Sequence, residues 1–326
     1  MSESTSPAPT GPGIVPCVAP HPLPAPGIIP GYPFWQYPRT PALGRSSIHD
    51  LYDDLGIEEV YHGLLNLRAD TPTFVLGRML HCLTLTPSGW DEQFMAAPTV
   101  ERRSDKDKAT WAAAQMEAAE SHRTLVKVDQ VEQATAMRDA ALRQSPFLRM
   151  ILARKTAQIE ASLFWQEVVP WPAAYQQSTT PDPIIVPCKG RPDWFDPKLK
   201  ALMDLKSAKG VRRHEIAKAI VQHGYHFQLA WYSRGLSEAG SVEIDNHLLC
   251  FICSEPPHRT RLFRLAPEAI TAAWKLMQPH LEVLAVAFAT GNWQEQEADE
   301  IPYIALPSYA TREMMDALEP VEGDAL

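Results

Sequence analysis

The sequence has few of the features that mark secreted or membrane proteins. Its five cysteines are an odd number without the spacing of a disulfide framework, so free thiols are expected. No apolar stretch reaches about 18 residues, and no charged region precedes a continuous apolar run near the N-terminus. Neither a membrane span nor a signal peptide is therefore predicted, and a cytoplasmic location is expected.

Charged residues are scarce in the first 44 positions, where proline is abundant instead. Twelve of the 30 prolines fall in this stretch, and each removes a backbone donor and fixes φ. Because such spacing blocks both helices and central strands, residues 1–44 are expected to form an extended, largely disordered arm. The remaining residues, about 280 in number, can bury one substantial core and predict a single large domain over residues 45–310.

The chain also lacks an excess of basic residues, since its formal net charge is −9. This charge argues at first against a nucleic-acid partner, because binding to phosphates needs Lys and Arg. However, the stretch after Gln294 holds nine acids and one base, whereas residues 186–218 hold nine bases and four acids. We therefore expect DNA to meet residues 186–218, and residues 311–326 to form an acidic tail that aids solubility or contacts a protein.

Apolar periodicity and capping residues predict the scaffold. Helices are expected near 47–55, 73–85, 105–119, 129–143, 146–153, 212–222, 225–235 and 267–289. Strands are expected near 158–169, 184–195, 199–207, 243–254 and 259–265. This order predicts an α/β fold with a mixed central β-sheet flanked by helices, preceded by an N-terminal helical region.

Two short motifs carry the strongest chemical signal. A Gly-Arg-Pro-Asp tetrapeptide ends at Asp193, and an Asp-Leu-Lys tripeptide spans Asp204 to Lys206. The turn-forming residues 196–198 between them predict a hairpin. Because side chains alternate along a strand, Asp204 and Lys206 share a face while Leu205 turns into the core. Asp193 can then oppose Asp204 across the strand pair.

Two carboxylates held close together repel each other unless a cation lies between them. Oxygen ligands with no nearby thiolate favour Mg²⁺ or Mn²⁺, and the chemistry that follows is phosphodiester hydrolysis by an activated water. Lys206 would position or deprotonate that water, or neutralise the phosphate. The alternative is a surface hairpin with one exposed ion pair, since Asp-x-Lys is a common pattern.

With Gln228 and Tyr232, which form a Gln-x-x-x-Tyr motif, these residues resemble the core of PD-(D/E)xK nucleases of the phage lambda exonuclease and RecB type. Within that superfamily the chain resembles most closely the RecE-type exonucleases (exonuclease VIII). Further similar stretches carry a histidine in an apolar helix, a Lys-rich segment before a helix, a glutamate strand and a closing segment: residues 74–82, 103–111, 158–165 and 291–307. The resemblance covers roughly residues 45–310.

The resemblance implies a role for each matching position. Asp193 and Asp204 would be the central metal ligands, Glu160 a further carboxylate ligand, and His81 a ligand to a second metal position. The Leu205 carbonyl would be an additional ligand, so two Mg²⁺ or Mn²⁺ ions per site are implied. Simpler explanations stay open, because His81 lies on an apolar helix and Glu160 could occupy the solvent face of its strand.

The catalytic lysine implied by the resemblance is Lys206. Gln228 and Tyr232 would organise the site and the DNA strand beside it, although an aromatic residue such as Tyr232 is most often part of a core. Lys106 and the adjacent pair Arg212 and Arg213 are further candidates for DNA contacts. For the pair, the alternative is that they cap a solvated helix.

The function implied is a Mg²⁺-dependent double-stranded DNA exonuclease. By resemblance it would digest 5′ to 3′, leave 3′ single-stranded tails for recombination of the phage type, form a closed ring of identical subunits, and act with a RecT-like single-strand annealing protein. Two other classes remain open. One is a structure-selective or restriction-type endonuclease on the same core, and the other is a non-catalytic DNA-binding module.

Overall fold

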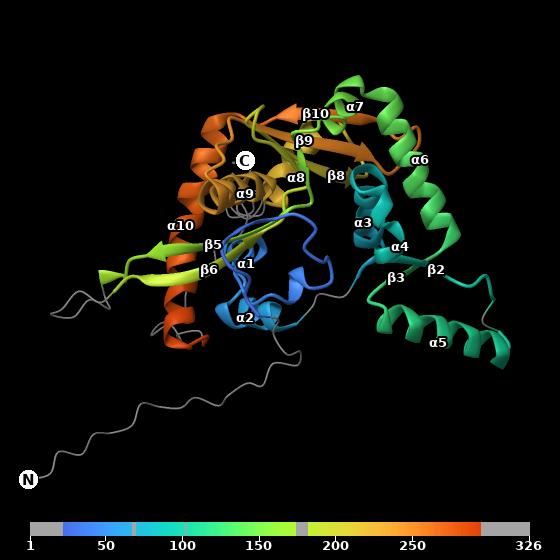
Figure 1. Cartoon of the computed structure of the whole chain (residues 1–326), viewed down its shortest axis with the longest axis horizontal. Helices are drawn as coiled ribbons and strands as arrows, with labels where there is room; N and C mark the ends of the chain where they lie inside the picture. Colours follow the sequence, from blue (N-terminus) through green and yellow to red (C-terminus); the bar gives the residue numbers. More distant parts are fainter. Residues whose placement is uncertain (1–21, 67–69, 102, 174–181, 295–326) are drawn as a thin grey trace, which may run out of the picture. The chain divides into compact units, whose positions relative to one another are not determined.

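The computed structural model describes residues 22–66, 70–101, 103–173 and 182–294 (Figure 1). Its central feature is a five-stranded sheet in which β8 and β9 run parallel and the other neighbours run antiparallel. The order across this sheet is β10 (Thr260–Arg264), β9 (Asn246–Cys253), β8 (Ala201–Ala208), β7 (Trp194–Asp196) and β4 (Gln158–Ile159).

Side-chain alternation along β8 divides the core into two layers. Met203 and Leu205 pack into one apolar cluster, which helices α3 (Pro72–Leu85), α6 (Val128–Gln144) and α7 (Pro146–Leu152) cover. Leu202 belongs to a second cluster on the opposite face. Helices α8 (Arg213–Gln222) and α9 (Tyr225–Gly240) contribute to that cluster. Asp204 and Lys206 share the face of Leu202 by the same alternation, as the sequence predicted.

A second sheet lies beside the central one. Strand β5 (Ser162–Val169) pairs antiparallel with β6 (Ile184–Gly190) on one side and with β1 (Gly27–Ile29) on the other. Helices α9 and α10 (Pro267–Thr290) pack against this sheet, and α1 (Arg45–Tyr52) and α2 (Ile57–Leu65) complete that side of the molecule (Figure 1). Among the described residues, no helix is long and apolar enough to cross a membrane.

A smaller part of the chain extends from α3. Strands β2 (Phe94–Ala96) and β3 (Thr124–Val126) pair in parallel, and α5 (Asp105–Glu120) packs beside β3, away from the central sheet (Figure 1). Three short elements fill connections: η1 (Tyr37–Arg39), η2 (Pro87–Gly89) and α4 (Trp90–Gln93). Within α5, Ala118 is buried and most other positions are exposed.

The α/β class, the mixed central sheet and most predicted elements are confirmed, but two predicted strands are broken. Residues 184–195 form two strands in different sheets, because Pro192 cannot donate to a ladder; only β7 forms the hairpin with β8. Residues 158–169 are likewise divided into β4 and β5 at Glu160, whose φ is 51°. Helix α2 was not predicted.

The prediction of a disordered arm over residues 1–44 is wrong for its second half. Strand β1 pairs with β5, and Leu43 exchanges backbone hydrogen bonds of 2.8 Å with Pro187 and Lys189 of β6. Leu43 is fully buried. The prolines of this segment are compatible with pairing at the edge of the sheet, because an edge strand needs backbone donors on only one side. Residues 1–21 and the predicted acidic tail at 311–326 lie outside the described residues, as does the predicted domain end at 310.

The Lys189 side chain fixes this segment to β6. Its Nζ donates to the carbonyl oxygens of Tyr37, Pro38 and Thr40 at 3.1, 3.2 and 2.7 Å. Burial lowers the pKa of Lys189 to about 8. Three carbonyl acceptors satisfy all three donors of the ammonium group. We use the term strap for residues 27–43, which are thus part of the folded domain.

The strap makes a testable contribution to stability. Leu43→Ala should lower the free energy of unfolding by about 2–4 kcal/mol, because it removes a fully buried side chain. Leu23→Ala, in the same proline-rich region but 42% exposed, should change it by less than about 0.5 kcal/mol. Urea unfolding of both variants measures the difference. Equal stability of the two would show that the strap does not pack on β6.

Candidate active site

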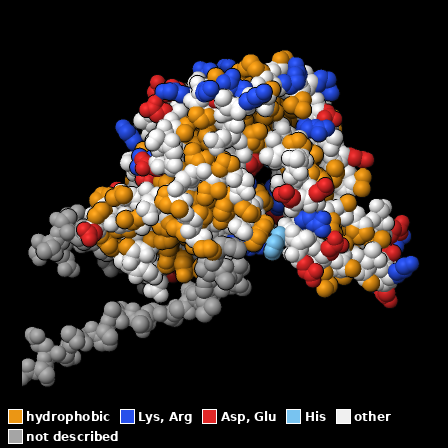
Figure 2. Space-filling model, viewed as in Figure 1, with side chains coloured by type: hydrophobic (Ala, Val, Ile, Leu, Met, Phe, Trp, Pro, Cys, Tyr) orange, Lys and Arg blue, Asp and Glu red, His pale blue; other side chains and the backbone are white. Residues whose placement is uncertain are grey.

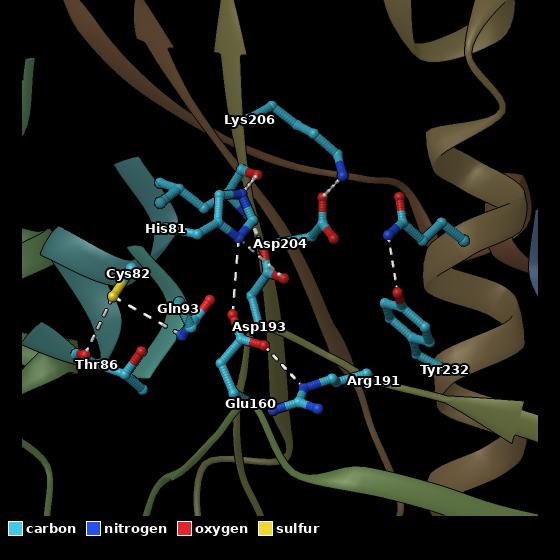
Figure 3. Close-up of polar contacts among 12 residues, drawn as sticks. His81, Cys82, Thr86, Gln93, Glu160, Arg191, Asp193, Asp204, Lys206 and Tyr232 are labelled. Atoms are coloured by element: carbon cyan, nitrogen blue, oxygen red, sulfur yellow. Dashed lines mark hydrogen bonds and ion pairs between the residues drawn. The ribbon is translucent and has the colours of Figure 1, made fainter. Parts of the chain in front are cut away.

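The candidate site lies where chain segments pass from one sheet to the other. Glu160 links β4 to β5, and residues 191–193 link β6 to β7. The two links are joined by a 3.1 Å hydrogen bond from the Glu160 backbone N–H to the Asp193 carbonyl. Figure 3 shows Glu160 and Asp193, one from each link, pointing toward His81 of α3, with Asp204 of β8 beside them. The site is therefore built from four separate stretches of sequence.

His81, Glu160 and Asp193 form a compact trio of potential ligands. Each offers an atom within 4.8 Å of the others. The Nδ1 atom of His81 lies 3.5 Å from Asp193 Oδ1 and 3.8 Å from Glu160 Oε1. On its other side, His81 Nε2 donates to the Leu205 carbonyl at 2.6 Å. His81 is thus a site residue, and the alternative of a satisfied core histidine does not describe its surroundings.

Asp204 and Lys206 lie beside this trio on β8. The Lys206 Nζ is 2.7 Å from Asp204 Oδ2, and Asp204 is 1% exposed. Asp193 is fixed from the same strand, because its Oδ2 accepts a 2.6 Å hydrogen bond from the Leu205 backbone N–H. The alternative of an exposed surface ion pair is therefore wrong, since Lys206 and Asp204 form a buried pair.

Burial and mutual charge shift the pKa values of these groups. Burial raises the pKa of Asp204 to about 6, and Lys206 opposes the shift. Burial acts in the opposite direction on His81 and Lys206, but neighbouring carboxylates outweigh it and raise both pKa values. The pKa of Asp193 is lowered, because His81 and Lys206 outweigh the effect of its burial. Cationic neighbours are therefore what keep these carboxylates ionised.

The residue set fits a divalent cation. Asp204 Oδ1 is buried and has no hydrogen-bond partner among the described residues. A buried carboxylate oxygen without a partner is costly unless a cation satisfies it. Carboxylates with one imidazole and a backbone carbonyl are oxygen-rich donors of the kind that Mg²⁺ and Mn²⁺ use. Asp193, Asp204 and the Leu205 carbonyl would hold such an ion, with His81 and Glu160 adjoining.

Arg191 is a site residue to which sequence reasoning assigned no role. Its Nε donates to Glu160 Oε2 at 3.0 Å, and its Nη1 donates to the Tyr32 carbonyl of the strap at 3.1 Å. Its guanidinium also lies over the Phe34 ring, 5.5 Å from the centroid. The signal in the sequence was a cation two residues before Asp193, but its partner Glu160 is 31 residues away.

Helix α9 forms another wall of the site. Gln228 Nε2 donates to the Tyr232 hydroxyl at 2.9 Å, as Figure 3 shows for Tyr232 and its unlabelled partner. The Tyr232 ring lies so close to β6 that a Cβ at Gly190 would be 3.1 Å from its Cδ1. The glycine of the Gly-Arg-Pro-Asp motif therefore allows this approach. Tyr232 is half-buried, whereas Trp231 is the true core aromatic.

The other predicted DNA contacts are not in this cluster. Arg212 caps α8 through a hydrogen bond and an ion pair with Glu215, as the capping alternative proposed. Arg213 is exposed at the first position of that helix. Lys106 is exposed on α5, which Figure 1 shows well separated from β8. Their contacts with DNA stay predictions.

A buried Asp opposite an Asp-x-Lys strand, on a mixed sheet covered by helices, defines a domain of the PD-(D/E)xK type. The chain belongs to the family DUF3799, described as a PDDEXK-like domain of unknown function, whose model matches residues 59–306. The resemblance to PD-(D/E)xK nucleases is thereby confirmed. Among curated proteins, none matches the chain.

Solved structures that are similar to the chain include two that are described as exonucleases. One is an exonuclease candidate from Eubacterium rectale, with 11% identity and a TM-score of 0.48, covering 86% of this chain and 94% of that chain. The other is a phage-related exonuclease from Haemophilus somnus 129PT, with 13% identity and a TM-score of 0.25, covering 58% of this chain and 91% of that chain.

Metal binding alone can test whether Asp193 is a metal ligand and Lys206 is not. Asp193→Asn should weaken Mn²⁺ binding by about tenfold or more, because it removes a charged ligand. Lys206→Ala should retain binding, since an ammonium group is no ligand and repels a cation. Calorimetric titration measures both, with the exposed Glu243→Gln as a charge-matched control. Equal loss in the Asp193 and Lys206 variants would contradict these roles.

Proposed function

We propose that the protein is a Mg²⁺- or Mn²⁺-dependent DNA exonuclease that acts on the ends of duplexes. The observation that carries this proposal is the buried Asp204 Oδ1 atom, which has no hydrogen-bond partner in the described part of the chain and lies beside Asp193 and the ammonium group of Lys206. Figure 2 shows a recess with acidic and basic side chains inside it, between the part carrying β5 and β6 and the part carrying β3. A DNA strand reaching this recess would meet both kinds of group.

A bound divalent cation would acidify a water and neutralise part of the phosphate charge. Asp193 and Asp204 would bind it, each held in place by a neighbour: the Leu205 N–H for Asp193 and Lys206 for Asp204. Lys206 has a raised pKa and stays protonated, so it serves as a point charge toward a phosphate oxygen or orients the attacking water. Glu160 is held by Arg191 and is available as a further ligand or proton acceptor.

The finer features of the proposal follow the RecE-type resemblance. They are digestion from 5′ to 3′, production of 3′ single-stranded tails for recombination by annealing, a closed ring of identical subunits, and a RecT-like annealing partner. One feature supports assembly. Val168 and Ile185 are opposite each other on β5 and β6 and are 63% and 58% exposed. Apolar side chains also cover much of the β5–β6 side in Figure 2.

Cleavage of defined DNA substrates tests the activity. With Mg²⁺ the protein should degrade linear duplex and leave covalently closed circles intact, and EDTA should stop the reaction. Efficient cutting of closed circles would establish an endonuclease instead. The absence of cleavage, with retained DNA binding, would establish a binding module.

The same assay tests Lys206. Lys206→Ala should lower the cleavage rate by about 100-fold or more, because it removes a fixed positive charge from the reacting phosphate. Its binding of linear DNA in EDTA should be almost unchanged. Lys200→Ala is the control, because Lys200 precedes the same strand but pairs with Glu243 at the surface. A Lys206 variant that cleaves as fast as the Lys200 variant would exclude the proposed site.

A further inference from the structure

Tyr37 brings a phenol from the strap to the edge of the candidate site. The residue begins η1, and its ring packs 6.3 Å from the Phe164 ring of β5, centroid to centroid. Two cations flank the same ring, Lys189 at 5.3 Å and Arg191 at 5.8 Å from the centroid. Since Arg191 also bonds Glu160, the ring adjoins the residues that form the cluster.

The strap holds this ring firmly. The Tyr37 backbone N–H donates to the Pro33 carbonyl at 3.2 Å, and the Tyr37 carbonyl accepts from Lys189. Arg191 bonds the Tyr32 carbonyl on the N-terminal side of η1. A side chain with its backbone fixed on both sides and its ring packed loses little further entropy when it binds a ligand.

The hydroxyl group of Tyr37 has no assigned task in the fold. Among the described residues, none makes a hydrogen bond to it, whereas the hydroxyl of nearby Tyr32 lies 3.2 Å from Thr40 Oγ1. Burial raises the pKa of Tyr37 above its usual range, with Arg191 lowering it and Glu160 raising it. The hydroxyl therefore stays a neutral O–H donor at every pH at which the protein would act.

The surroundings favour an anion as the acceptor. Arg191 and Glu160 both affect the pKa of Tyr37, and burial and then Tyr37 raise the pKa of Tyr232, so these side chains lie near one another. Glu160 is already engaged by Arg191, and Tyr232 by Gln228. An anionic acceptor between these side chains could accept a hydrogen bond from the Tyr37 O–H, and the positive charges of Lys189 and Arg191 beside the ring would stabilise it.

We propose that Tyr37 is a substrate-contacting residue whose hydroxyl donates a hydrogen bond to a nonbridging phosphate oxygen of the DNA strand at the cluster. This inference rests on the proposed function and adds the strap to the active site. The donor is neutral, so it positions the phosphate without competing with Lys206 as a charge. Removal of the strap would therefore remove a wall of the site as well as packing on β6.

The test compares two tyrosines of the strap. The Tyr32 hydroxyl has a hydrogen-bond partner in Thr40, whereas the Tyr37 hydroxyl has none among the described residues. Tyr37→Phe should lower kcat/KM for linear duplex by about tenfold or more, because it deletes a hydrogen bond to a charged group and keeps the ring. Tyr32→Phe removes the hydroxyl that faces Thr40 and should leave kcat/KM nearly unchanged. Thermal unfolding should give Tyr37→Phe a Tm close to that of the wild type.

Sulfur substitution at the cleaved phosphate distinguishes a direct hydrogen bond from Tyr37 to the phosphate from a purely structural role of Tyr37. Sulfur is a weaker acceptor than oxygen, so the loss caused by Tyr37→Phe should shrink on one of the two phosphorothioate diastereomers. An equal loss on the phosphate and on both diastereomers would overturn the contact, as would wild-type kcat/KM in Tyr37→Phe. A wild-type protein that cleaves no DNA would instead refute the proposed function, so the two failures are distinguishable.

Discussion

The burial of three carboxylates in one small volume is the constraint on which the rest of the structure depends. Glu160, Asp193 and Asp204 are all at most about one-fifth exposed. Each lies beside a cationic or protonatable side chain: Arg191 for Glu160 and His81 for Asp193, both distant in sequence, and Lys206 of the same strand for Asp204. Loss of one partner would leave an uncompensated buried charge, which is far more costly than loss of an exposed pair.

The fold meets this constraint by placing the carboxylates where strands change sheets. A continuous strand would direct Glu160 and Asp193 along one sheet, but the positive φ at Glu160 and the break at Pro192 turn both toward β8. The backbone hydrogen bond between Glu160 and Asp193 then joins the two turns. Backbone strain of this kind is maintained only when surrounding contacts determine it, and α3, α9 and the strap supply those contacts.

Much of this arrangement could be predicted from local patterns. The period of two along β8 placed Asp204 and Lys206 on one face, and capping residues located α3, α5 and α7 closely. The family resemblance placed His81 and Glu160 with Asp193, and the structure brings the three together although His81 and Glu160 precede Asp193 by 112 and 33 residues. Local periodicity alone gives neither residue a role in the site. The sequence around His81 is that of an ordinary apolar helix, and the sequence around Glu160 is that of an ordinary alternating strand.

What could not be predicted depends on partners distant in sequence. The strap has a composition typical of disorder, and its order comes from pairing with β5 and β6, well over 100 residues further on. Arg191 and Tyr37 gain their significance from the same long-range contacts. Arg212 shows the opposite case, because a basic segment suggested DNA contact while a local capping interaction with Glu215 engages the side chain.

The central claim is that the buried carboxylates form a divalent-cation site. Its most direct test is X-ray diffraction from crystals soaked in Mn²⁺, with anomalous difference density used to locate the ion. The account predicts a peak bounded by Asp193, Asp204 and the Leu205 carbonyl, adjoining His81, and its loss in Asp204→Asn crystals. Manganese bound only elsewhere, with the Asp204 oxygen satisfied by a protein group or water, would contradict it.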